Sequence, residues 1–394
     1  MTDLEALDRA DPLARFRDLF ELPQGVIYLD GNSLGPLPKA TKLRLAEVVQ
    51  REWGRDLIRS WETNGWMKLP FRVGEKIGRV IGAEPDRTVA GDSTSVNLFK
   101  ALAAALTLRP ERRIILSERG NFPTDLYMAD GLCRLLARGH TVLAVEPEAI
   151  DAALDEHVAV LLLTHIDFRS GRMHDMVRLT RAAHAVGAVT VWDLSHSAGA
   201  VPLDVAGAGA DFAVGCGYKF LNGGPGSPGF LYVAARHRDV AMPLTGWMGH
   251  DDPFAFAPDY VPAAGIGRAL VGTPAVMGLA ALEVGVDLVL SADMQAVRTK
   301  SLQMTELFIG AATAAGFRVV TPLDPTRRGS QVCVAHSRAA SIMRGLIARG
   351  VIGDFRPPDV LRFGITPLTL RFEEIGVAVR AMTAEAEQPP RLAG

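Results

Sequence analysis

The segment Asp211-Phe-Ala-Val-Gly-Cys-Gly-Tyr-Lys219-Phe-Leu-Asn-Gly-Gly-Pro-Gly-Ser-Pro-Gly-Phe-Leu-Tyr-Val233 decides the fold. Its two apolar runs, 211–215 and 229–233, enclose a lysine and a loop dense in glycine. Both runs have the length and the β-branched and aromatic content of buried strands. Lys219 therefore lies just beyond a predicted strand, where an amine shielded from water suits Schiff-base formation with an aldehyde. A lone loop lysine is more often simply solvated, so its surroundings must decide.

Similar apolar runs recur upstream and alternate with stretches of helical pattern. They lie at 113–117, 141–145, 158–164 and 189–193. Strands that alternate with helices need crossover connections, so we predict an α/β fold with a mostly parallel sheet covered on both faces. Ligands of such sheets bind beyond the C-terminal ends of the strands. Polar residues gather after these runs, and we expect the chemistry there.

Composition and charge narrow the function class. The chain has 394 residues, is 48% hydrophobic and carries a formal charge of −2 with scattered Lys and Arg, so we expect neither nucleic-acid nor membrane binding. The longest apolar runs are far shorter than the ~20 residues of a membrane span. Cys133, Cys216 and Cys333 are far apart without CxxC spacing, which disfavours a metal site or disulfides. The N-terminal residues predict a surface helix and no signal peptide, so we expect a soluble, cytoplasmic protein.

A Gly/Pro-rich segment at 253–274 interrupts the alternation, and a long helical stretch from about Ala275 to Ala315 follows. We therefore predict an N-terminal segment (1–60) that packs on the small domain, a large α/β domain (61–270) and a smaller α+β domain (271–394). Runs 332–335 and 361–365 are the expected strands of the smaller domain.

Two residues near a second predicted strand end suggest a cofactor. Asp193 ends the run 189–193, and a buried carboxylate there needs a cationic partner. The protonated ring nitrogen of pyridoxal phosphate (PLP) would be such a partner, although a helix N-cap is about equally consistent with Asp193. His196 follows three residues later and could contact the same ring or be a structural histidine.

Two further clusters suit the rest of that cofactor. Thr94 and Ser95 precede an amphipathic helix, where hydroxyls and backbone amides can bind a phosphate, although simple N-capping would also explain them. Phe122, in Asn121-Phe-Pro-Thr-Asp125, follows another strand and could stack on a flat ring. Taken alone, such an aromatic residue is more often part of the core.

Six motifs, in order along the chain, resemble the kynureninase family. They are Tyr28–Pro36, Phe122–Asp125, Asp193–His196, Gly217–Gly223, Gly246–Trp247 and Arg362–Leu368, within a similarity that runs from about residue 20 to 380. The resemblance implies fold type I of the PLP-dependent transferases. In that fold, the large α/β domain has a mostly parallel seven-stranded sheet, and the N-terminal segment joins the C-terminal part in the small domain. It also implies hydrolysis of L-kynurenine to anthranilate and L-alanine, in tryptophan degradation.

The same resemblance implies roles for individual residues. Lys219 would bind the aldehyde of PLP, Asp193 would pair with its ring nitrogen, and Tyr218 would reach the phosphate and serve as a catalytic acid. The other implied cofactor residues are Thr94, Ser95, Phe122, Asp125, Ser170 and His196, with Trp247 and Thr273 supplied by the other subunit of a homodimer. Arg362 would bind the substrate carboxylate, although a strand-edge surface arginine is the alternative, and Ser33 and Trp66 would border the substrate ring.

Two positions depart from part of the family. Thr273 stands where some relatives carry Asn, and Trp66 stands where animal relatives carry His. The second departure implies a preference for kynurenine over 3-hydroxykynurenine.

Two other functions remain open. A PLP lyase such as a cysteine desulfurase needs a mobile catalytic cysteine, but Cys216 lies in a predicted buried strand and Tyr218 replaces the histidine usual before the lysine of desulfurases. A non-catalytic PLP-binding protein is the second alternative. An NAD-binding protein is disfavoured, because no GxGxxG follows the first predicted strand.

Overall fold

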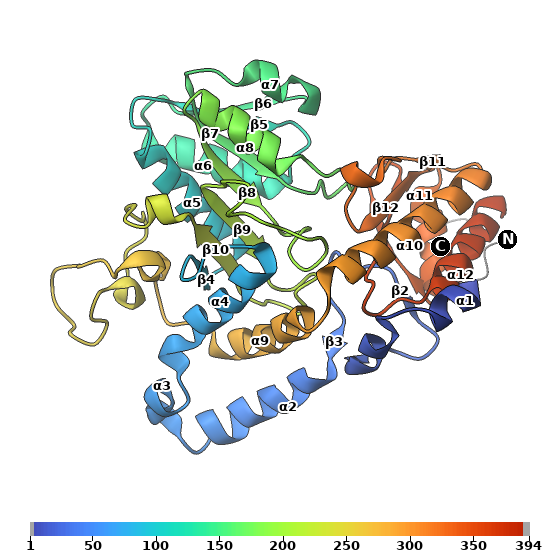
Figure 1. Ribbon diagram of the computed structural model, residues 1–394, viewed down its shortest axis with the longest axis horizontal. Coiled ribbons are helices and arrows are strands. Elements are labelled where there is room, and N and C mark those ends of the chain that lie inside the picture. Colours follow the sequence, from blue (N-terminus) through green and yellow to red (C-terminus); the bar gives the residue numbers. More distant parts are fainter. Residues whose placement is uncertain (1–3, 389–394) are drawn as a thin grey trace.

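The computed structural model describes residues 4–388. Figure 1 shows a larger part built around a central sheet and a smaller part in which the C-terminal elements and the N-terminal helix α1 lie together. The helices α2 and α9 lie along the lower side of the larger part. No helix within residues 4–388 is long and apolar enough to cross a membrane.

Seven strands form the central sheet in the order β4-β10-β9-β8-β7-β5-β6. Strand β10 is antiparallel to both of its neighbours, and the pairs from β9 to β6 are all parallel. The carboxyl ends of the six other strands therefore share one edge. The predicted mostly parallel sheet is confirmed. The strands are β4 (Thr88–Ala90), β5 (Ile114–Glu118), β6 (Thr141–Val145), β7 (Val158–Thr164), β8 (Val189–Asp193), β9 (Phe212–Cys216) and β10 (Gly229–Val233).

Helices cover both faces of this sheet, as its apolar strands require. In β7, Leu161 and Leu163 face one core cluster while Val160 and Leu162 face the other, which is the two-residue period of a strand. The first cluster includes side chains of α4, α8 and α9, and the second includes side chains of α5 and α6. The helices of this part are α2 (Lys39–Glu47), α3 (Ser60–Thr63), α4 (Leu69–Ile81), α5 (Thr94–Thr107), α6 (Pro123–Leu136), α7 (Ile150–Ala153), α8 (Met176–Ala185) and α9 (Val276–Leu290).

The smaller part has its own antiparallel sheet, in the order β11-β12-β15-β14. The N-terminal segment joins it, because β2 (Ile27–Tyr28) pairs with β13 (Val351–Ile352) and α1 contacts α12. The short strands β1 (Phe20–Glu21) and β3 (Leu37–Pro38) pair with each other. The remaining elements are α1 (Leu4–Arg9), α10 (Met294–Ala314), β11 (Arg318–Val319), β12 (Gln331–Ala335), α11 (Ala339–Ala348), β14 (Asp354–Arg356), β15 (Val360–Gly364) and α12 (Phe372–Glu387).

The expected helical stretch from about Ala275 to Ala315 is confirmed, and the structure divides it into two helices, α9 and α10. Asp293 caps α10 by accepting a hydrogen bond of 2.9 Å from the amide of Gln295. The two helices pack differently: α9 contacts α4 and α2, whereas α10 contacts α12. The division of the chain at residues 60 and 270 stays a prediction.

Candidate active site

The polar residues that follow the strands meet at one edge of the central sheet. Asp193 is the last residue of β8, Lys219 lies three residues beyond β9, and Phe122 lies four residues beyond β5. Parallel pairing brings these strand ends together although the residues are far apart in sequence.

The Lys219 amine lies among side chains that the sequence analysis singled out. Its Nζ is 3.0 Å from Nε2 of His196, 5.8 Å from the centre of the Phe122 ring and 5.9 Å from that of Tyr218. Burial, with the nearby charge of Lys219, holds the pKa of His196 well below its usual range. The imidazole is therefore neutral at physiological pH, and Nε2 can accept a hydrogen bond from the amine.

Two buried carboxyl groups lie next to this amine. Asp193 accepts a hydrogen bond of 2.7 Å from the amide of Ser195, and Asp125 accepts one of 3.2 Å from the hydroxyl of Thr164. Burial, and then the charge of Asp193, raise the pKa of Asp125 well above its usual range. Charging two such groups together in a dry site is costly, and the charge of Lys219 acts in the opposite direction on Asp125. The protonated ring nitrogen of PLP would be a further cation that suits this pair.

The start of α5 offers unused donors for a phosphate. Ser93 caps the helix by accepting a hydrogen bond of 3.3 Å from the amide of Val96, so the cap does not use Thr94 or Ser95. The hydroxyl oxygens of Thr94 and Ser227 are buried without a partner within the described part of the chain. Hydroxyls and free amides at a helix N-terminus suit a phosphate. The amine, the acid pair and these hydroxyls together fit PLP.

Arg362 forms a second site in the smaller part. The residue is 1% exposed, so the alternative of a surface arginine is wrong. Its Nη2 donates to Ser33 Oγ at 2.6 Å and to Asp354 Oδ2 at 2.5 Å, and its Nη1 donates to the carbonyl of Phe168 at 3.0 Å. Its Nε is buried and has no acceptor among residues 4–388. A buried guanidinium with a free N–H suits a carboxylate ligand.

Phe168 joins the two sites. Its ring packs edge-on against Phe122 with 5.3 Å between the ring centres, while its carbonyl accepts the hydrogen bond from Arg362. Ser170, two residues on, bonds Asp167 through its hydroxyl and accepts a hydrogen bond of 2.8 Å from Thr321 through its carbonyl. The arginine and the lysine therefore belong to one continuous region between the two parts of the molecule.

Three of the residues named from sequence lie apart from the Lys219 group. Trp66 and Trp247 both pack edge-on against Trp61, with ring centres 6.0 and 5.8 Å away. Thr273 is exposed in the loop before α9. No hydrogen bond or ring contact joins Trp66, Trp247 or Thr273 to Lys219 in residues 4–388.

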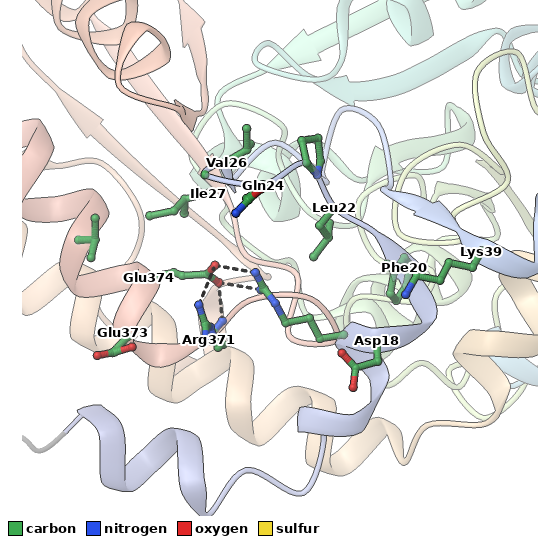
Figure 2. A pocket seen from close by; sticks show the side chains of 14 residues that line it. Asp18, Phe20, Leu22, Gln24, Val26, Ile27, Lys39, Arg371, Glu373 and Glu374 are labelled. Carbon is green, nitrogen blue, oxygen red and sulfur yellow. Dashed lines mark hydrogen bonds and ion pairs between the residues drawn. The ribbon is translucent and has the colours of Figure 1, made fainter.

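A large cavity elsewhere in the molecule has no comparable chemistry. It has a volume of about 600 Å³ and lies between the N-terminal segment and the start of α12 (Figure 2). Arg17 donates to both carboxylate oxygens of Glu374 at 2.9 and 2.8 Å, so these charges neutralise each other. None of the residues predicted for the site lines this cavity.

Some residues of the site were missed by sequence reasoning. Asn121 accepts hydrogen bonds from the hydroxyl of Thr164 at 2.5 Å and from the amide of Phe122 at 2.9 Å, and so holds the loop that carries Phe122. Its signal was its place in the strand-end motif. Asp354 is opposite Arg362 in the β14–β15 register, and no local pattern marks that pairing.

Comparisons with known proteins agree on one family. The family described as Kynureninase C-terminal domain matches residues 297–382. A kynureninase from Deinococcus radiodurans is 52% identical over 398 residues, covering 98% of this chain and 97% of its own length. A kynureninase from Pseudomonas fluorescens is 48% identical over 390 residues, covering 96% of this chain and 94% of its own length.

Solved structures support the fold. A cysteine desulfurase from Thermococcus onnurineus NA1 has a TM-score of 0.80 at 18% identity, covering 94% of this chain and 97% of its own. A mutant of C-DES with glycine covalently linked to its PLP cofactor has a TM-score of 0.81 at 16% identity, covering 93% of this chain and 98% of its own. Because the sequence identity is this low, these two matches bear on the fold alone. They confirm the predicted fold type I.

Proposed function

The chain belongs to the kynureninase family, and on this premise we propose that it hydrolyses the Cβ–Cγ bond of L-kynurenine with PLP, yielding anthranilate and L-alanine. The observation that carries the proposal is the Lys219 amine, held 3.0 Å from neutral His196 beside the buried Asp193 and Asp125 pair. A lysine for the aldehyde and an acid for the ring nitrogen are what a PLP enzyme requires.

Bound PLP supplies an electron sink for the charge that develops on the substrate. Lys219 would hold the cofactor through its aldehyde, and its free amine would move the proton at the substrate Cα. Asp193 would hold a proton on the ring nitrogen, and Phe122 would lie against the ring. The remaining proposed cofactor contacts come from Thr94, Ser95, Asp125, Ser170, His196 and Tyr218.

The substrate is oriented by the second site. Arg362 binds the α-carboxylate through its guanidinium fork, and Ser33, whose hydroxyl is 2.6 Å from Arg362 Nη2, borders the substrate next to it. Burial, with the charge of Cys216 as the next cause, raises the pKa of the Tyr218 hydroxyl well above its usual range. Tyr218 therefore stays protonated at neutral pH and can return a proton to Cβ.

We propose a homodimer in which Trp247 and Thr273 complete the phosphate pocket of the partner. Large apolar side chains are exposed on the segment after α2 and on the loop before residue 261, and patches of this kind mark association surfaces. They are Trp53, Leu57, Ile58, Phe254 and Phe256. Mixing Lys219→Ala with Trp247→Ala subunits, each inactive alone, tests this arrangement. Recovery of roughly a quarter of the wild-type activity is expected if sites are shared, and no recovery would contradict it.

A desulfurase activity has less support. Cys216 and Cys333 lie in the buried strands β9 and β12, and Cys133 is buried in α6, so none is on a mobile loop. Buried thiols also suit a reducing compartment, and we propose the cytoplasm.

The test follows anthranilate by its fluorescence after the purified protein is mixed with PLP and L-kynurenine. Parallel reactions use 3-hydroxykynurenine and L-cysteine. Anthranilate with equimolar alanine, formed faster than 3-hydroxyanthranilate, is the expected result. Turnover of L-cysteine without turnover of either kynurenine would overturn the proposal in favour of the desulfurase.

A further inference from the structure

Glu52 is a buried carboxylate with no role in the site described so far. Its side chain is 3% exposed, and both oxygens are engaged. Oε1 accepts a hydrogen bond of 2.6 Å from Arg44, and Oε2 accepts one of 2.7 Å from the indole N–H of Trp66. Glu52 lies in a π-helical turn, Val48–Trp53, that follows α2. Such turns are rare and frequently occur at functional sites.

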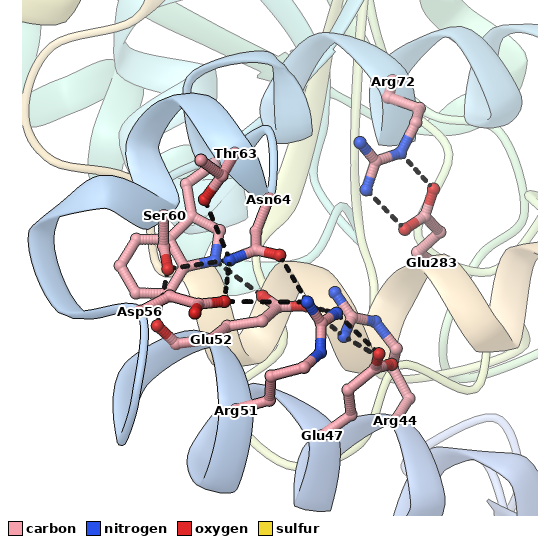
Figure 3. Close-up of polar contacts among 11 residues, drawn as sticks. Arg44, Glu47, Arg51, Glu52, Asp56, Ser60, Thr63, Asn64, Arg72 and Glu283 are labelled. Atoms are coloured by element: carbon pink, nitrogen blue, oxygen red, sulfur yellow. Dashed lines mark hydrogen bonds and ion pairs between the residues drawn. The ribbon is translucent and has the colours of Figure 1, made fainter.

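A set of polar contacts holds Glu52 in place (Figure 3). Ser60 donates to the Glu52 carbonyl at 2.5 Å, and Asn64 donates to the Ser60 hydroxyl at 2.9 Å. Arg51 donates to the side-chain oxygen of Asn64 at 2.9 Å. The backbone and the side chain of Glu52 are thus both fixed, and the carboxylate presents one oxygen to Trp66 in a defined direction.

The ring of Trp66 borders an apolar cavity. The cavity has a volume of about 370 Å³ and is otherwise lined by Val48, Trp53 and residues 275–278 at the start of α9. That stretch begins two residues after Thr273. Trp61 also packs edge-on against Trp66, with 6.0 Å between the ring centres.

A purely structural role would not need the indole. The ion pair between Glu52 and Arg44 already neutralises the buried carboxylate, and Ser60 already holds the turn. The hydrogen bond to Trp66 has a different effect, which is on the orientation of the indole ring. An indole has a single N–H donor, so one fixed acceptor selects one of the two flipped orientations of its ring. These orientations fill different space beside the cavity.

We propose that Glu52 is a positioning residue that fixes the Trp66 ring against the aryl group of the substrate and so sets the discrimination against an added ring hydroxyl. The inference rests on the proposed function and on the role that the family resemblance implies for Trp66, which is to border that aryl group. Within one protomer Trp66 lies apart from Lys219, and it shares its neighbour Trp61 with Trp247, which we propose acts in the site of the partner. Strengthening or weakening one hydrogen bond outside the reacting atoms then changes substrate choice without changing the chemistry.

The first test is Glu52→Gln, which keeps the size of the side chain but removes its charge. We expect the KM for kynurenine to rise about tenfold, with kcat changed less than about threefold. The ratio of kcat/KM between kynurenine and 3-hydroxykynurenine falls, while the affinity for PLP, measured by absorbance, is unchanged. Glu47→Gln is the matched control, because Glu47 pairs with Arg44 and Arg51 at the surface and makes no contact with Trp66.

A double-mutant cycle separates positioning from general damage. In a Trp66→Phe background, which lacks the N–H donor, Glu52→Gln must leave the substrate ratio unchanged. The same shift of the ratio in both backgrounds would overturn the inference, as would wild-type ratios in a folded Glu52→Gln. If Glu52→Gln does not fold, the shorter Glu52→Asp must shift the ratio instead. A wild-type protein that cleaves neither substrate would refute the proposed function, which is a separate outcome.

Discussion

Replacing Arg362 by lysine tests whether the guanidinium fork recognises the substrate. Nη2 of Arg362 donates hydrogen bonds to Ser33 and Asp354, and its Nη1 donates one to the carbonyl of Phe168. Its Nε alone is buried without a partner in residues 4–388. A substrate carboxylate can therefore accept from Nε and compete with Asp354 for Nη2. Lysine keeps the charge but has no fork, so one of these two hydrogen bonds is lost.

The expected change in affinity of Arg362→Lys follows from the loss of one hydrogen bond to the substrate carboxylate. One charge-assisted hydrogen bond in a buried site is worth about 1.5–3 kcal/mol, which corresponds to about 10- to 150-fold in affinity. We expect the KM of Arg362→Lys for kynurenine to rise within that range. The value of kcat should change much less, because the carboxylate contact is made equally before and during the reaction.

The assay is steady-state anthranilate fluorescence together with cofactor absorbance and the melting temperature. Arg318→Lys is the matched control, because Arg318 pairs with Asp359 at the surface of the same domain at 3.2 Å and should change neither constant. A KM within about threefold of wild type, in a variant that folds and binds PLP, would refute the role given to Arg362.

Three other substitutions test the site and its surroundings. Lys219→Ala should abolish turnover and the visible absorbance of lysine-bound PLP, and retention of either would rule out its role. Gly35→Ala should weaken PLP binding, because a Cβ there would lie 2.2 Å from the Lys219 carbonyl; an unchanged absorbance titration would contradict this. Burial, opposed by a hydrogen bond from Ser33, raises the pKa of Asp30 from 3.8 to about 6. The folded state therefore loses stability as pH rises from 3.8 to about 6. Asp30→Asn should raise the melting temperature at pH 7 and not at pH 4. An equal rise of the melting temperature at both pH values would contradict this account of Asp30.

Most of the central sheet was predictable because its strands are uninterrupted apolar runs. The bounds of β6, β7, β8 and β10 agree with the sequence prediction, and β5 and β9 are shifted by one residue. The helical stretch from about Ala275 to Ala315 was predicted without its division into α9 and α10, although Ser291 and Asp293 are polar and Asp is a residue type that commonly caps a helix.

The candidate site likewise contains residues that the sequence could identify and residues that it could not. Lys219, Asp193 and Phe122 could be named because each lies at the end of a strand or just beyond it, and parallel strands bring such positions to one edge. Glu52 could not be named from the sequence, because an acidic residue at the end of a helix is ordinarily solvated. Its burial depends on Trp66 and Arg44, which no period in the sequence relates to it.

The sequence by itself determined the fold type and the identity of the groups at the strand ends, because strand periodicity and the order of motifs are local properties of the chain. Only the tertiary structure decided that Arg362 is buried, and that it meets Ser33 from 329 positions away and Asp354 from the facing strand. Burial and charge pairing depend on segments that are distant along the chain and become neighbours only when the two parts of the molecule pack together.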